Sequence, residues 1–181
     1  MYNFIYSRPL WLVVFLVLLL AVLWSRWDEL AAADKSRRWK WKLLNLAVLP
    51  VSFLFIAEVT LLRREPMAES VVILQPFATL ARIAEQPEYI RTMLMNAALF
   101  MPLGLSVAGL FPHRWPAVVK IMPAVLIGAA VSCGVEQLQY LHLLGTAEVD
   151  DVICNTLGAL MGAQFVLIAP IRRRFFKNLS W

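Results

Sequence analysis

The stretch that decides the fold class lies between Lys120 and Glu148 and reads IMPAVLIGAAVSCGVEQLQYLHLLGTA. Its 27 residues carry one formal charge, that of Glu136. A helix needs about 20 mostly apolar residues to cross the hydrocarbon core of a bilayer. The stretch therefore predicts a transmembrane helix near residues 119–142. A single strand is excluded, because its open edge would leave backbone groups without hydrogen bonds in lipid.

Four more intervals on either side of this stretch are nearly free of charge. They predict transmembrane helices near residues 9–26, 42–62, 92–112 and 150–170. The composition agrees, because hydrophobic residues make up 61% of the 181-residue chain and charged residues 16%, against roughly 45–50% and 25% in soluble domains. Lipid must cover part of this apolar surface. We expect an all-α integral membrane protein, a bundle of about five transmembrane helices.

The basic residues predict the orientation of the helices. Lysine and arginine favour the cytoplasmic side of a membrane, and 12 of the 17 lie in the segments 26–42, 114–120 and 172–177. The N-terminus is therefore predicted outside and the C-terminus in the cytoplasm. This bias explains the net charge of +5 without a nucleic-acid partner, for which the basic residues would share one soluble face. We expect membrane lipids as partners of the basic segments instead.

The longest connection between predicted spans runs from Arg63 to Arg91. Its apolar residues, among them Val71, Val72 and Phe77, make it too hydrophobic for a free loop, yet three prolines break it and it is too short to cross the membrane. We predict an interfacial or re-entrant segment in this outer loop. A plain surface loop is the alternative.

Polar residues inside the predicted spans gather near one side of the membrane. Asn96, Glu136, Gln139, Asp151 and Asn155 all lie toward the outer ends of their spans, in an orientation that was derived without them. An ionised carboxylate costs at least ~2.5–3.5 kcal/mol at the bilayer centre, so Glu136 should be protonated, paired or facing a wet cavity. One interpretation is an outward-open polar pocket. The alternative is that these groups hydrogen-bond one another and hold the helices together.

The last predicted span carries a stripe of small and polar residues. Asp151, Asn155, Gly158 and Gly162 follow the spacing i, i+4, i+7 and i+11, which places them on one face of a helix. The glycines on this face allow a neighbouring helix to approach closely. We therefore expect this stripe to face the rest of the bundle.

Sequence motifs of soluble enzymes are absent. The chain has no nucleophile elbow, HExxH motif, P-loop or dinucleotide fingerprint. Its two cysteines, Cys133 and Cys154, do not have the spacing of a metal site. We therefore expect neither a metal nor another cofactor.

Three motifs occur in a fixed order along the chain. They are the LQPF stretch at 74–77, the N-x3-F-x-P-x-G pattern at 96–104, and E-x2-Q at 136–139 followed by D-x3-N-T-L-G-x3-G at 151–162. Together they resemble the VanZ-like family of small bacterial membrane proteins. The resemblance covers about residues 71–166. It implies a VanZ-like transmembrane domain there, after a region of two helices without a recognised motif (1–70) and before a basic tail (167–181).

The chain departs from the family pattern in the loop before its last motif. The family usually has an arginine where this sequence has Gly145, and an aspartate where it has Glu148, which keeps the carboxylate. The missing arginine removes a cationic partner for Glu136 or Asp151. Arg91, which enters its span from the same side, is a candidate to replace it.

The resemblance also implies a role in the cell envelope. The family is named for a protein that lowers susceptibility to the lipoglycopeptide teicoplanin, without the enzymes that remodel peptidoglycan termini. We therefore expect a protein of the bacterial cytoplasmic membrane, connected with antibiotic resistance. The residues that we expect to bind the polar group of its ligand are Asn96, Glu136, Gln139, Glu148, Asp151 and Asn155.

Three classes of function fit these residues. The first is a binding module for an envelope lipid, a cell-wall lipid precursor or a lipid-tailed glycopeptide antibiotic. The second is an intramembrane enzyme that acts on an envelope lipid, with Glu136 and Asp151 dividing the acid and base roles. The third is a small proton-coupled transporter, in which Glu136 would carry the proton.

Overall fold

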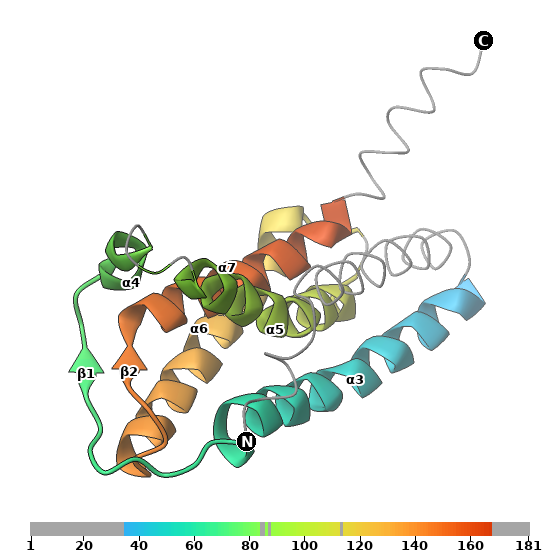
Figure 1. Cartoon of the computed structure of the whole chain (residues 1–181). Coiled ribbons are helices and arrows are strands. Elements are labelled where there is room, and N and C mark those ends of the chain that lie inside the picture. The colour runs from blue at the N-terminus through green and yellow to red at the C-terminus, as the bar shows by residue number, and fades with distance from the viewer. Residues whose placement is uncertain (1–34, 84–85, 87, 113, 168–181) are drawn as a thin grey trace.

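Long helices make up most of the part of the protein that the structure describes (Figure 1). The computed structural model describes residues 35–83, 86, 88–112 and 114–167; the span predicted near 9–26 and most of the tail at 167–181 lie outside them. The long helices in this part are α3 (Lys35–Ala57), α5 (Glu88–Leu110), α6 (Ala117–Leu141) and α7 (Val149–Gln164). A π-helical turn, Glu58–Leu62, extends α3, and a 3-10 turn, Phe165–Leu167, extends α7. The predicted all-α fold is confirmed, with a minor sheet added to it.

Three of these helices are long and apolar enough to cross a membrane. They cover residues 38–62, 88–110 and 117–141, which confirms the spans predicted near 42–62, 92–112 and 119–142. Helix α7 has 16 residues and is not one of the three found in the described part of the chain. The span predicted for it reaches residue 170, beyond the residues that the structure describes.

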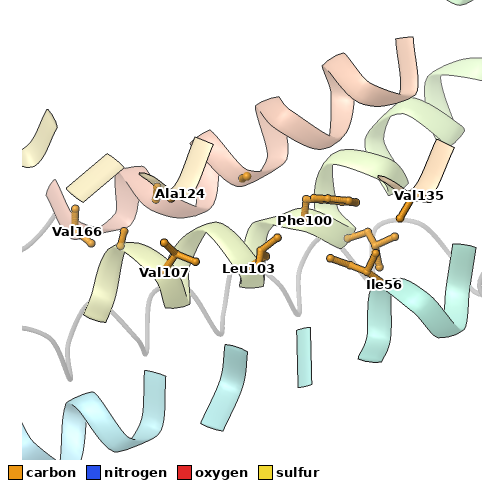
Figure 2. Close-up of a cluster of buried hydrophobic side chains, with 11 residues drawn as sticks. Ile56, Phe100, Leu103, Val107, Ala124, Val135 and Val166 are labelled. Atoms are coloured by element: carbon orange, nitrogen blue, oxygen red, sulfur yellow. The ribbon is translucent and has the colours of Figure 1, made fainter. Parts of the chain in front are cut away.

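Helix α5 is the centre of the bundle. In its most apolar window 61% of the residues are buried, against 22% for α3 and 28% for α6. Figure 2 shows Phe100, Leu103 and Val107 of α5 among side chains from the neighbouring helices, including Ile56 of α3 and Val135 of α6. Helices α3 and α6 instead expose large apolar side chains, among them Leu46, Val51, Leu54, Val118, Leu126 and Leu141. Such faces fit contact with acyl chains, as the composition requires.

The closest helix contact joins α5 to α7. The carbonyl of Ala97 lies where Gly158 would carry a Cβ atom, and the carbonyl of Met101 lies where Gly162 would carry one. In the opposite direction, Gly104 of α5 meets the backbone of Ala159 in the same way. The two glycines of the stripe predicted on the last span therefore face α5 and let the two backbones touch.

The segment between α3 and α5 lies along the loop between α6 and α7 (Figure 1). It contains β1 (Val72–Ile73) and the short helix α4 (Ala78–Arg82), and β1 pairs in parallel with β2 (Ala147–Glu148). This sheet was not expected from the sequence, which predicted an interfacial or re-entrant segment here. The pairing satisfies backbone groups of the segment and ties it to the start of α7.

The glycine contact allows a direct test of the helix packing. Gly158→Ala puts a Cβ atom onto the Ala97 carbonyl, so we expect it to lower the free energy of unfolding by about 1–3 kcal/mol, the usual cost of overpacking. Thermal unfolding of the purified protein in detergent measures this loss. The matched control is Gly134→Ala on α6, where an added Cβ meets no atom within 4 Å. Equal melting temperatures for the two variants would contradict the close contact.

Candidate functional site

Helices α6 and α7 form an antiparallel pair whose facing residues repeat every helical turn. At its middle, a Cβ atom on Gly128 would lie 2.5 Å from that of Ala159. One turn further, Asn155 Nδ2 donates to Ser132 Oγ at 2.8 Å. One more turn brings Glu136 to the start of α7, where its Oε2 accepts the backbone N–H of Glu148 at 2.9 Å. The apolar interface thus becomes polar toward the end of the pair where α6 finishes and α7 begins. We call this region, around Glu136 and the start of α7, the polar end.

Helix α5 contributes to the polar end through its own N-terminal half. Asn96 Nδ2 donates to Asp151 Oδ1 at 2.8 Å, across the contact between α5 and α7. Asp151 also interacts electrostatically with Glu136. The structure therefore brings Asn96, Glu136, Asp151 and Asn155 together from three helices, α5, α6 and α7.

Gln139 is the predicted site residue that faces elsewhere. Its Nε2 donates to the backbone carbonyl of Thr60 at 2.9 Å, in the π-helical turn after α3. The Gln139 side chain is 1% exposed and ties α6 to α3. Glu58, at the start of the same turn, is exposed and pairs with Arg63 at 2.7 Å.

Two acidic residues at the start of α7 hold the segment that contains α4. Glu148 Oε2 accepts a hydrogen bond from Thr79 Oγ1 at 2.9 Å. Asp150, which is 4% exposed, accepts the backbone N–H groups of Phe77 at 2.6 Å and of Thr79 at 2.7 Å. The first N–H groups of a helix have no partner within it, so Asp150 caps α4 from another helix. Sequence reasoning missed Asp150, although its place beside Asp151 was a signal.

Arg64 is a basic side chain at the polar end. A Cβ atom on Gly145 would lie 2.5 Å from Arg64 Nη1, and Nη1 donates to the Leu144 carbonyl at 3.5 Å. Gly145 has a φ of +156°, which suits glycine and leaves this space to the guanidinium. The charge of Arg64 also acts on Glu136 and Asp151. Arg64 therefore lies beside Gly145, the position at which the family usually has an arginine. The suggestion that Arg91 replaces that arginine stays a prediction.

Several acceptors at the polar end have unused capacity. Glu136 and Asp151 each use one carboxylate oxygen in a hydrogen bond. The other oxygens, Glu136 Oε1 and Asp151 Oδ2, have no hydrogen-bond partner among the described residues. The buried Asn155 Oδ1 also lacks a partner in this part of the chain. Within the same described ranges, no group of three or more His, Cys, Asp or Glu residues could hold a metal ion. The arrangement is suited to accept hydrogen bonds from a ligand and to stabilise positive charge.

Comparison with known proteins places the chain among membrane proteins of one family. A family model described as VanZ/LLP1 matches residues 10–171. The match includes the three motifs and also most of the N-terminal region, where the sequence showed no motif. Neither the curated proteins nor the solved structures gave a match.

The capping role of Asp150 predicts a local effect of its removal. In Asp150→Ala the N–H groups of Phe77 and Thr79 lose their acceptors, so we expect their hydrogen exchange to become faster and the protein to lose about 1.5–3 kcal/mol of stability, as for hydrogen bonds to a charged group. Hydrogen–deuterium exchange with mass spectrometry measures this over residues 77–82. The control is Glu69→Ala, an exposed carboxylate on the same segment. Unchanged exchange at residues 77–79 in Asp150→Ala would show that Asp150 does not hold α4.

Proposed function

Because the chain belongs to the VanZ-like family and has helices that can cross a membrane, we propose that it binds an envelope amphiphile at its polar end. The ligand is an envelope lipid or a lipid-tailed glycopeptide antibiotic. Its polar group contacts Asn96, Glu136, Glu148 and Asp151, while its chain lies along the apolar helices. Binding of the antibiotic in this way lowers the susceptibility of the cell to it.

The observation that carries this proposal is the meeting of polar groups from three helices at one level. The Asn96–Asp151 hydrogen bond joins α5 to α7, and the Glu136–Glu148 hydrogen bond joins α6 to the same helix start. Each carboxylate keeps an oxygen without a partner in the described residues. Groups that served only to hold the helices together would not need this spare capacity, so it favours a ligand over purely structural hydrogen bonds.

The surroundings of the polar end fit an amphiphile. Large apolar side chains are exposed on α6 as far as Leu138 and Leu141, one turn beyond Glu136. On the other side, Leu74 and Phe77 are exposed on the segment that carries β1 and α4. A ligand with a polar group and an acyl chain can therefore meet carboxylates and apolar surface together. The positive-inside pattern predicts that this end lies on the outer side of the membrane, where such ligands are found.

Binding to the purified protein tests the proposal. The double variant Glu136→Gln, Asp151→Asn keeps the shape of both side chains and an acceptor oxygen on each, but removes both charges. We expect it to bind teicoplanin, or a fluorescent phospholipid presented in vesicles, at least about tenfold more weakly than the wild type. Cells that express the variant should lose any tolerance to teicoplanin that the wild type provides at equal membrane levels.

The matched control is Glu58→Gln, which removes an exposed carboxylate that already pairs with Arg63. Its affinity should equal that of the wild type. Equal affinity of the double variant and the wild type for every probe would remove the polar end as a binding site.

A further inference from the structure

Arg64 is a cation with unused hydrogen-bond donors. Its guanidinium carries five N–H donors, of which one makes the 3.5 Å contact with the Leu144 carbonyl. The side chain is exposed, and within the described residues no carboxylate oxygen lies within 4.0 Å of it. Its neighbour Gly145 has no side chain to cover it. Arg64 is therefore available to an anionic group that approaches the polar end.

Three acceptors with unused capacity lie on the facing sides of α6 and α7. Glu136 Oε1 and Asp151 Oδ2 belong to carboxylates that interact electrostatically. Asn155 Oδ1 lies one helical turn below Asp151, in a side chain that is 3% exposed and bonds to Ser132 through its other atom. A buried acceptor without a donor is unfavourable, so Asn155 points to a ligand group that donates. A primary ammonium supplies three N–H donors and the positive charge that two carboxylates stabilise.

Both sets of groups lie at the polar end, because Arg64 lies beside Gly145 and the backbone N–H of Glu148, three residues further along, donates to Glu136. Arg64 interacts electrostatically with both Glu136 and Asp151. Its side chain forms no ion pair with either carboxylate within 4.0 Å. The polar end therefore offers one positive group and two negative groups that are not paired with it. A small zwitterion fits this arrangement. Its negative group can meet the cation, while its positive group, which a short linker separates from the negative one, meets the carboxylates.

We propose that the polar end binds a zwitterionic phospholipid headgroup, with its phosphate on Arg64 and its primary ammonium on Glu136, Asp151 and Asn155. This inference rests on the proposed function and names the ligand class within it. Guanidinium binds phosphate through paired hydrogen bonds. A quaternary ammonium has no N–H donor, and a glycerol headgroup has no positive charge. The site should therefore prefer a phosphoethanolamine headgroup to phosphocholine and to phosphoglycerol.

Native mass spectrometry of the purified chain tests this selectivity. The probes are phosphatidylethanolamine, phosphatidylcholine and phosphatidylglycerol with identical acyl chains. We expect the wild type to bind phosphatidylethanolamine about tenfold more tightly than the other two. Asp151→Asn should remove most of this preference. Arg64→Gln should weaken the binding of phosphatidylethanolamine about tenfold, and Arg64→Lys should restore part of it, because the charge returns without the fork of donors.

The control is Arg63→Gln, which removes the neighbouring arginine that already pairs with Glu58. It should leave all three affinities unchanged, and a thermal melt of each variant identifies any that fails to fold. Binding without preference among the headgroups, or binding that Arg64→Gln does not change, overturns this inference and leaves the proposed function standing. Binding of none of the lipids nor of teicoplanin by the wild type overturns both.

Discussion

The contact between the backbones of α5 and α7 is the constraint on which the rest of the structure depends. Gly158 and Gly162 leave room for the carbonyls of Ala97 and Met101, so the two helices approach more closely than side chains would permit. In lipid this kind of packing matters more than in water, because the hydrophobic effect does not drive one helix against another there. The same approach brings Asn96 within 2.8 Å of Asp151. Close packing and the polar site are therefore consequences of one interface.

The polar end combines groups that hold the structure with groups that remain available. Asp150 is used completely, since both of its oxygens accept backbone N–H groups of the segment around α4. Glu136 and Asp151 each use one oxygen. This division offsets the cost of placing acidic residues near the membrane. Asp150 has its hydrogen bonds within the fold, and Glu136 and Asp151 interact electrostatically with the guanidinium of Arg64. The satisfied ones fix the positions from which the available ones can act.

The segment between α3 and α5 completes this end of the molecule. Its strand β1 pairs in parallel with β2. Ser70 and Arg64 donate hydrogen bonds to backbone carbonyls of the loop between α6 and α7. Short parallel pairing of this kind contributes little by itself, so its stability depends on the capping by Asp150 and on the Thr79–Glu148 hydrogen bond. A segment that the composition suggested for the membrane interface is thus fixed directly beside the candidate site.

The sequence by itself determined the membrane class, three of the spans and the face of the last helix that carries Asp151, Asn155 and the glycines. These depend on local spacing, since apolar length and the helical repeat can be read along a single segment. The sequence predicted Asn96 only at a similar depth in the membrane, and the tertiary structure decided that it bonds to Asp151, 55 residues away. The tertiary structure decided that Gln139 bonds to Thr60 and that Arg64 lies beside Gly145, pairs separated by about 80 residues in sequence. No local pattern encodes such pairs, because the packing of several helices sets which distant side chains meet.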